Sequence, residues 1–448
     1  MRELGQAAGL PPLLHRVGAR SGAVALAGQD DRVPTPPPAD VIEPHTWLNE
    51  IQTRAELDRR LADGSLVGLT VQGLRLDLGP VPDLSGIEVA GTLFVGCRFA
   101  SRQVGADLVR RGANVVPPFS GLPYPTQPPH LYTPEELAAG FTEGGFEAMY
   151  DSRVYAHFRA HGGALPDVRE ALGQRLHDHG VDNALADATR AWLATHGPQS
   201  VVGVMGGHAV RRGSAPYRTA AVLGWELARA HRLVVTGGGP GVMEAANLGA
   251  YLSTRPAEDL TAAIDLLATA PDFTDHDRYT AAALRVRELF GRSVTPPENG
   301  AEPAVAYRAD STALATGDLD WANCGGLAVP TWLYGHEPAN LFAGRIAKYF
   351  SNAIREDTIL RLARGGIVFA PGRAGTVQEV FQAATKTYYG TDGASGAYVF
   401  LDREYWTTEL PVESLLRPLL ATSPFGDLSG AVHLTDDVHE AVRLLVRV

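Results

Sequence analysis

The sequence predicts an α/β protein whose main domain is a Rossmann-like parallel sheet flanked by helices. Two short apolar runs, Leu233–Thr236 and Gly366–Ala370, have the length of a buried strand, and each leads into a glycine-rich turn and a helical pattern. A third run, Val201–Met205, also ends in glycines. Alternating strands and helices form parallel sheets that bind ligands at the carboxyl ends of the strands, so we expect a ligand site there.

The turn that follows Gly366–Ala370 has the sequence PGRAGTVQE, from Pro371 to Glu379. Its two glycines allow the backbone to approach a ligand closely. The free N–H groups at the start of the next helix offer an anion site, typically for phosphate. Glu379 lies off the apolar stripe of that helix and can face a cleft. The residues expected to face the sheet are Val377, Val380, Phe381 and Ala384.

The turn after Leu233–Thr236 is Gly237–Gly241, and it leads into a helix at Val242–Asn247. Pro240 suits a helix start, because the N–H that proline lacks has no partner there. Either turn alone is compatible with an ordinary tight turn of an α/β protein. Two such elements in one domain favour a shared ligand site.

These two motifs resemble those of a known family. PGRAGTVQE is similar to the PGGxGTxxE motif of the lonely-guy (LOG) nucleoside-monophosphate phosphoribohydrolases, and TGGGPGVMEAAN resembles the other glycine-rich motif of that family. The resemblance is strongest to the large bacterial pyrimidine/purine nucleotide 5′-monophosphate nucleosidases, and it covers Gln199 to the C-terminus apart from an insertion. Arg373 stands where the family motif has its second glycine.

The resemblance implies hydrolysis of the N-glycosidic bond of nucleoside 5′-monophosphates to free base and ribose 5-phosphate. Glu379 matches the catalytic glutamate of the family. A carboxylate there stabilises positive charge on the ribose and orients the attacking water. Because Glu379 lies early in its helix, we expect the helix dipole to favour its ionised form.

The family also uses an arginine on the preceding helix, and Arg355 is the nearest match. It lies one residue further from the proline than the family spacing, so Arg345, Arg361 and Arg364 remain alternatives. A guanidinium group there would bind substrate oxygens. The competing interpretation is an exposed helix arginine that pairs with Glu356 or Asp357.

The expected phosphate site is Gly372–Thr376, with Gly237–Gly241 helping to shape it. If the backbone at Arg373 has negative φ, its guanidinium can clamp the phosphate; a positive φ would strain the turn. His208 is either a ligand contact or a structural residue. The predicted substrate-binding residues are Gly206, Gly207, Ser214, Gly237, Gly238, Gly239, Gly241, Gly372, Arg373, Gly375 and Thr376.

The sequence suggests no cofactor and no metal. Asp275–Asp277 and His336–Glu337 contain possible metal ligands but lack a partnering cluster at a recognisable spacing. Two functions compete with the hydrolase: a non-catalytic nucleotide sensor, which Arg373 and the insertion keep open, and a transferase that passes the sugar to another acceptor. The resemblance also implies a homodimer or a larger homo-oligomer.

The chain divides into three regions. Residues 1–45 are proline-rich and are expected to be a poorly ordered lead-in, and residues 46–198 form a mixed α+β N-terminal domain that we expect to contribute no catalytic group. Residues 199–448 form the Rossmann-like domain. Its helical insertion at about 252–323 is either a lid or an oligomerisation element.

Further elements follow from hydrophobic periodicity. In the N-terminal domain we expect a helix at Trp47–Ala62 and strand alternation between Ile87 and Phe99. The other expected elements are helices at Arg218–Ala230, Leu260–Ala268, Tyr279–Leu289 and Val438–Leu445, a loose stretch at Thr295–Val305, and strands at Leu327–Pro330, Ala397–Leu401 and Val432–Thr435.

The composition excludes several classes of protein. The net charge of −11 and the pI of about 5.7 argue against non-specific binding of nucleic acid or anionic membranes. No apolar run is long enough to span a bilayer, and no signal sequence is recognisable. The two cysteines, Cys97 and Cys324, lack metal-ligand spacing, so we expect buried, reduced thiols in a cytoplasmic protein.

Overall fold

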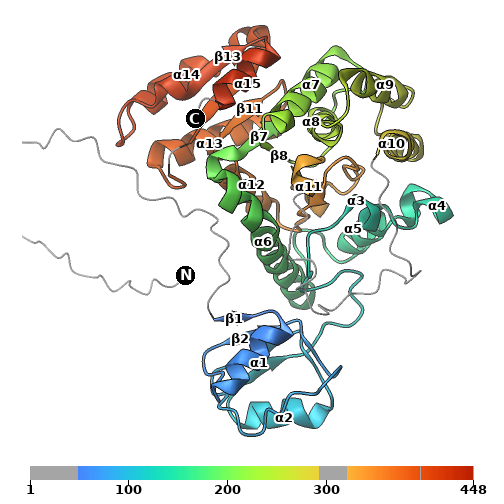
Figure 1. Cartoon of the computed structure of the whole chain (residues 1–448), viewed down its shortest axis with the longest axis vertical. Coiled ribbons are helices and arrows are strands. Elements are labelled where there is room, and N and C mark those ends of the chain that lie inside the picture. The colour runs from blue at the N-terminus through green and yellow to red at the C-terminus, as the bar shows by residue number, and fades with distance from the viewer. Residues whose placement is uncertain (1–48, 292–319, 394, 447–448) are drawn as a thin grey trace, which may run out of the picture.

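The computed structural model describes residues 49–291, 320–393 and 395–446. A small N-terminal domain, residues 49–116, lies at one end of the molecule, and the rest is built around a seven-stranded sheet (Figure 1). The predicted lead-in, residues 1–45, and the predicted loose stretch, Thr295–Val305, lie outside the described residues.

The seven-stranded sheet is entirely parallel, in the order β10-β9-β8-β7-β11-β12-β13, and confirms the Rossmann-like fold. In the centre, Val368 pairs with Val204 on one side and with Val399 on the other. The two-residue strand β10 was not predicted, because so short a run has no recognisable period. The strands are β7 (Val201–Met205), β8 (Leu233–Thr236), β9 (Leu327–Ala328), β10 (Arg345–Ile346), β11 (Gly366–Phe369), β12 (Ala397–Leu401) and β13 (Val432–Thr435).

The strand order reverses between β7 and β11. Strands β8 to β10 extend the sheet from β7 in one direction, and β12 and β13 extend it from β11 in the other. In such sheets the connections diverge at the reversal and leave a crevice at the carboxyl ends of the two strands. Hydrogen bonds join the loops there: Gly207 N donates to Pro371 O at 2.9 Å, and Val242 N donates to Gly207 O at 3.2 Å.

Helices cover both faces of the sheet, and alternate residues of one strand enter opposite cores. Val204 of β7 belongs to one buried cluster and Met205 to the other. The helices on the Val204 side are α7 (Ala215–Arg229), α8 (Val242–Tyr251) and α15 (Val438–Val446). The helices on the Met205 side are α6 (Val168–His196), α12 (Asn352–Leu362), α13 (Ala374–Tyr389) and α14 (Glu413–Ala421). In α13, Val380 and Ala384 are buried as predicted, but Phe381 is exposed.

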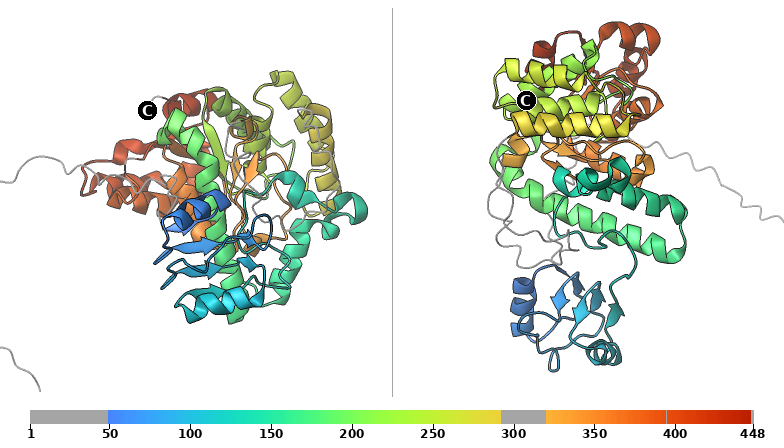
Figure 2. Two further views of the ribbon diagram at one scale, coloured as in Figure 1. Left: turned by 60° about the horizontal axis from the view of Figure 1, so that its bottom comes forward. Right: turned by 90° about the vertical axis from the view of Figure 1, so that its right-hand side faces the viewer.

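The segment between residues 124 and 196 packs against the sheet. From the sequence alone, we expect it to be part of the N-terminal domain, residues 46–198. Tyr124 and Phe158 lie in the cluster of Val204, and Trp192 lies in the cluster of Met205. The long helix α6 lies between the sheet and the N-terminal domain (Figure 2). The amphipathic pattern of a helix shows that one face is buried but does not identify its partner. The other helices here are α3 (Pro134–Ala138), α4 (Phe141–Gly144) and α5 (Tyr150–Ala160).

The N-terminal domain has parallel strands of its own, in the order β1-β2-β4-β6 and with β3 beside β5. Its predicted helix was wrong at its start, because Thr53 and Glu56 form a capping box that begins the helix at Arg54. Ile87 and Val89 lie before β4 and outside any strand. The elements are β1 (Glu50–Ile51), α1 (Arg54–Ala62), β2 (Thr70–Gln72), β3 (Arg75–Leu76), β4 (Leu93–Val95), β5 (Arg98–Phe99), α2 (Arg102–Arg110) and β6 (Asn114–Val116).

The insertion packs against α8 through a buried polar cluster. Glu244 of α8 accepts hydrogen bonds from Arg212 Nε at 2.9 Å, from Tyr217 Oη at 2.9 Å and from Tyr279 Oη at 2.7 Å. The Arg212 guanidinium also lies 3.1 Å from the centre of the Tyr279 ring. Because Tyr279 belongs to the insertion, this cluster fixes the insertion to α8, the helix that follows the glycine-rich turn. Its described helices are α9 (Ala257–Leu267), α10 (His276–Phe290) and α11 (Asp320–Asn323).

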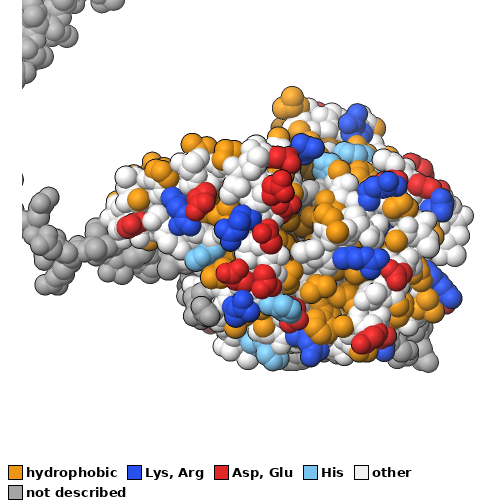
Figure 3. Space-filling model, turned by 90° about the horizontal axis from the view of Figure 1, so that it is seen from above, with side chains coloured by type: hydrophobic (Ala, Val, Ile, Leu, Met, Phe, Trp, Pro, Cys, Tyr) orange, Lys and Arg blue, Asp and Glu red, His pale blue; other side chains and the backbone are white. Residues whose placement is uncertain are grey.

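The cysteines, the helices and the surface charges bear on the expectations drawn from composition. Cys97 is buried as expected, but Cys324 is only half-buried, and neither is in a disulfide. None of the described helices is long and apolar enough to cross a membrane. On the face seen in Figure 3, acidic and basic side chains are interspersed.

Replacing Arg212 with Met should strongly destabilise the protein. The substitution leaves the Glu244 carboxylate buried without its cation, which typically costs about 3–5 kcal/mol. Scanning calorimetry should show a clearly lower Tm than for the wild type. The control is Arg285→Met on α10, where Arg285 pairs with Glu288 and both side chains are more than half exposed. Equal melting temperatures for the two variants would contradict a stabilising role of the cluster.

Candidate active site

A cleft of about 390 Å³ opens at the carboxyl edge of the sheet, where the strand order reverses. It is formed by the loops after β7, β8, β9 and β11 together with the starts of α12 and α13. Its walls carry three carboxylates and several cationic side chains. The charged and histidine residues that line it are His208, His336, Glu337, Lys348, Arg355, Glu356, Arg373 and Glu379.

The glycines after β8 allow side chains to approach the backbone closely. A Cβ atom added at Gly237 would lie 2.5 Å from Arg355 Nη2, and one added at Gly239 would lie 2.9 Å from Glu337 Oε2. Both distances are below van der Waals contact, so any larger residue would displace these groups. Gly238, between them, has a φ of +74°, which side-chain-bearing residues rarely adopt.

Arg355 is buried, which excludes the interpretation of an exposed helix arginine. Its Nε donates to Val329 O at 2.9 Å, and its Nη2 donates to Gly237 O at 3.3 Å. Its Nη1 lies 3.4 Å from Glu379 Oε1. The guanidinium therefore joins the ends of β8 and β9 to α13. Asp357, its proposed surface partner, instead binds Arg361 and Lys386.

The carboxylate of Glu379 is largely buried, and its side chain is 12% exposed. Burial raises the pKa of Glu379, the Arg355 guanidinium opposes that increase, and Glu356 adds to it. The expectation that the helix dipole sets the ionisation was therefore wrong. Glu379 lies six residues after the N-cap Arg373, beyond the first turn to which the dipole effect is confined.

The start of α13 has backbone N–H groups arranged as in sites that bind anions. The N–H groups of Ala374, Gly375 and Thr376 precede the first bond of the helix, from Val377 N to Arg373 O. Arg373 has φ −112° and ψ −154°, so the negative-φ alternative holds and the turn is not strained by a side chain there. The Arg373 side chain is exposed and lines the cleft, where it can reach an anion.

Most predicted binding residues line this cleft, and three do not. Ser214 precedes α7 at its N-cap position and does not line the cleft, and its Oγ donates to Arg211 O at 2.7 Å. Gly241 has a φ of +70° and lies against Gly207 O, so it forms the turn rather than the wall. Gly372 lies against Thr376. The predicted residues that line the cleft are Gly206, Gly207, Gly237, Gly238, Gly239, Arg355, Arg373, Gly375, Thr376 and Glu379.

Two charged residues of the cleft were not identified from the sequence. Lys348 is buried, and its Nζ lies 2.6 Å from Asp151 Oδ1, which also accepts a hydrogen bond from Trp332 Nε1 at 2.8 Å. Asp151 belongs to α5 and is 197 residues away in the chain. Glu356 accepts hydrogen bonds from Asn352 and Gln378, both at 2.8 Å. No local motif marks either residue, because Asp151 and Gln378 approach them only in the fold.

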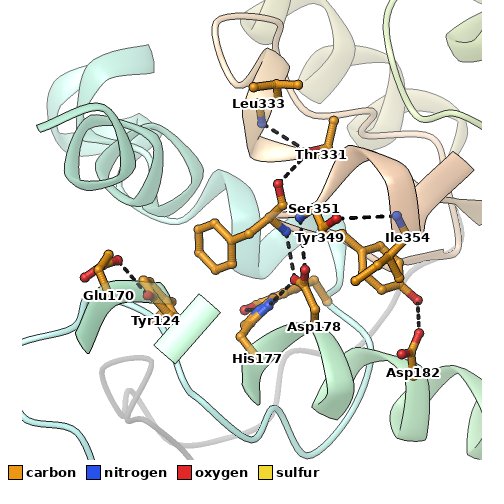
Figure 4. A network of polar contacts seen from close by, with 12 residues as sticks. Tyr124, Glu170, His177, Asp178, Asp182, Thr331, Leu333, Tyr349, Ser351 and Ile354 are labelled. Carbon is orange, nitrogen blue, oxygen red and sulfur yellow. Dashed lines mark hydrogen bonds and ion pairs between the residues drawn. The ribbon is translucent and has the colours of Figure 1, made fainter. Parts of the chain in front are cut away.

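A second polar network fixes the turn that leads into α12 (Figure 4). The carboxylate of Asp178 on α6 accepts hydrogen bonds from Phe350 N at 2.8 Å and from Ser351 N at 2.9 Å. Tyr349 Oη donates to Asp182 on the next turn of α6 at 2.9 Å. Helix α6 therefore sets the position from which Arg355 enters the cleft.

Among the residues that the structure describes, no group of three histidine, cysteine or acidic side chains could hold a metal ion. Asp275 and Asp277, which the sequence singled out, have structural partners. Asp275 caps α10, and Asp277 Oδ1 accepts a hydrogen bond from Phe146 N at 2.7 Å.

The fold and the cleft together define a Rossmann-like α/β protein with a cleft between two glycine-rich loops. Residues 199–254 match the model of the SLOG cluster4 family, which places this segment in the SLOG superfamily with LOG-like proteins. The matched segment contains β7, β8 and the glycines between Gly237 and Gly241, and ends before Arg355 and Glu379. This similarity is compatible with a nucleotide-related function. No curated protein matches the chain.

Replacing Asp178 with Ala should destabilise the protein and weaken ligand binding in the cleft. The substitution leaves the N–H groups of Phe350 and Ser351 without their acceptor, at about 1–3 kcal/mol for each buried donor. Calorimetry and ligand titration would measure both effects. The matched control is Asp187→Ala on the same helix, whose side chain is 44% exposed and pairs with Arg190. If the two variants behaved alike, the network would not position α12.

Proposed function

We propose that this protein hydrolyses the N-glycosidic bond of nucleoside 5′-monophosphates and releases free base and ribose 5-phosphate. The observation that carries the proposal is the buried pair of Arg355 and Glu379, which faces a cleft beside the free N–H groups of α13. An anion site, a guanidinium and a carboxylate in one cleft supply a place for the phosphate, a ribose contact and a group that acts at the anomeric carbon.

The geometry suggests the role of each group. The phosphate binds the N–H groups of Ala374–Thr376, and Arg373 adds a positive charge from the exposed side. Arg355 donates to ribose oxygens with the part of its guanidinium that faces the cleft, while Val329 and Gly237 hold the rest. Glu379 stabilises the positive charge that develops on the ribose and takes a proton from the attacking water.

The raised pKa of Glu379 suits this role. A general base works best when its pKa lies near the operating pH, because it must be ionised and still accept a proton readily. Arg355 opposes the effect of burial on this pKa and favours the ionised carboxylate. The pair thus combines a desolvated carboxylate with a fixed counter-charge.

Incubation with a panel of nucleoside monophosphates, followed by chromatography, tests the proposal. Hydrolysis yields equal amounts of free base and ribose 5-phosphate with water as the only acceptor. Base release only in the presence of a second acceptor would identify a transferase. Tight binding without turnover would identify a nucleotide sensor, the alternative that Arg373 and the insertion keep open.

Replacing Glu379 with Gln should lower kcat for base release by about 100-fold or more, the usual effect of removing a general base. Binding should change little, because the amide keeps the shape of the side chain and the group acts mainly in the transition state. Rapid-quench kinetics and calorimetric titration measure the two quantities. Turnover at the wild-type rate would remove Glu379 from the mechanism.

Replacing Arg373 with Ala should weaken the binding of nucleoside monophosphates by about tenfold, the size of one charge-assisted contact. Binding of the matching nucleosides should stay nearly constant, because they lack the phosphate. The difference should grow at low salt, where screening is weaker. Arg403→Ala, another exposed arginine outside the cleft, serves as the control. Equal losses for nucleotide and nucleoside would exclude a phosphate clamp.

A further inference from the structure

A third carboxylate, Glu337, lines the same cleft and approaches the loop after β8 at Gly239. It lies in the segment that follows the short 3-10 helix η4 (Trp332–Tyr334). A Cβ atom added at Gly237 would contact Arg355, and one added at Gly239 would contact Glu337. Two residues of chain span at most about 7 Å, so the two side chains flank a short stretch of one loop.

Glu337 differs from the other two carboxylates of the cleft in the kind of partner it has. Glu356 is held by two amide groups, and Glu379 is paired with a guanidinium. In the described part of the chain, the side chain within ion-pair distance of Glu337 is His208, whose Nδ1 lies 3.5 Å from Glu337 Oε1. The Glu337 side chain is 15% exposed, whereas His208 is 55% exposed. This environment stabilises the charged form of Glu337 only weakly.

Burial raises the pKa of Glu337, and four groups around it oppose that effect: His208, His336, Arg355 and Lys348. Lys348 is already neutralised by Asp151, and Arg355 is in direct contact with Glu379. Glu379 therefore has an arginine in direct contact, whereas Glu337 has a half-exposed histidine. Such a difference between two acids in one cleft is the usual basis for dividing the roles of general acid and general base.

The side chains around Glu337 suit a nucleobase. Met243 Cε would lie 2.8 Å from a Cβ atom added at Gly239, next to Glu337 Oε2 at 2.9 Å, so a thioether and a carboxyl group flank the same point. Tyr334 and His208 line this part of the cleft as well. Flat apolar and aromatic surfaces with one polar group are typical of sites that bind ring systems.

We propose that Glu337 is the general acid that protonates the leaving base, opposite Glu379. The inference rests on the proposed hydrolase function and adds a second catalytic residue to it. As the bond between the anomeric carbon and the base nitrogen breaks, the base takes the proton of Glu337. The water oxygen bonds to the anomeric carbon, and its proton passes to Glu379. Afterwards Glu379 releases that proton to solvent, and the half-exposed His208 takes a proton from solvent and passes it to Glu337, so both carboxyl groups and the histidine return to their starting states.

The test compares two leaving groups. One substrate is whichever of AMP, GMP, CMP and UMP the wild-type protein hydrolyses fastest. The other is 4-nitrophenyl ribose 5-phosphate, whose nitrophenolate departs without protonation. For the wild type, kcat/KM with the nucleotide should fall as the pH rises, because Glu337 loses its proton. With the nitrophenyl compound this alkaline decrease should be absent.

Variants then test whether Glu337 causes the alkaline decrease in kcat/KM. Glu337→Gln should lower kcat for the nucleotide by about 100-fold or more. It should lower kcat for the nitrophenyl compound by less than about tenfold and abolish the alkaline decrease with the nucleotide. Glu379→Gln should reduce turnover of both compounds. Glu288→Gln, an exposed carboxylate of α10, should change neither.

The outcomes distinguish the inference from the proposed function. If the wild type hydrolyses neither compound, the proposed function and the inference both fail. If the wild type is active but shows the same alkaline decrease with both compounds, only the inference fails, and this result needs no variant. Equal losses on both compounds for a folded Glu337→Gln protein, as judged by circular dichroism, would likewise assign Glu337 a structural role only.

Discussion

The arrangement of the cleft depends on one buried guanidinium. Arg355 binds the backbone carbonyls of Val329 and Gly237 and the carboxylate of Glu379, so one side chain fixes two strand ends and a helix relative to one another. A buried cation is stable only when its donors are satisfied. The close approach of the β8 loop, which Gly237 permits, is therefore a condition for the whole site.

Helices that are distant from the cleft residues in sequence hold those residues in place. Asp178 of α6 holds the turn before Arg355, and Asp151 of α5 neutralises Lys348. On the other face, Arg212 and Glu244 fix the insertion to α8. The segment before the sheet thus provides charges that position cleft residues, which explains how it can affect a site without supplying one of the proposed catalytic groups.

Three glutamates face one cleft, yet their surroundings give them different chemistry. Glu356 is held by two amide donors and is suited to shaping the wall. Glu379 contacts a guanidinium, and the ion-pair partner of Glu337 is a half-exposed histidine. Because pKa depends on burial and neighbouring charge rather than on residue type, the same side chain can serve as a structural acceptor, a base or an acid.

The sequence by itself determined the features that depend on short segments of chain. The runs Val201–Met205 and Ala397–Leu401 matched their strands residue for residue, and the glycine-rich turns indicated the edge that carries the cleft. Only the tertiary structure decided the burial of Glu379, the pairing of Lys348 with Asp151 and the place of Glu337. Periodicity and turn chemistry act over a few residues, whereas burial and charge pairing arise between residues that folding brings together from distant parts of the chain.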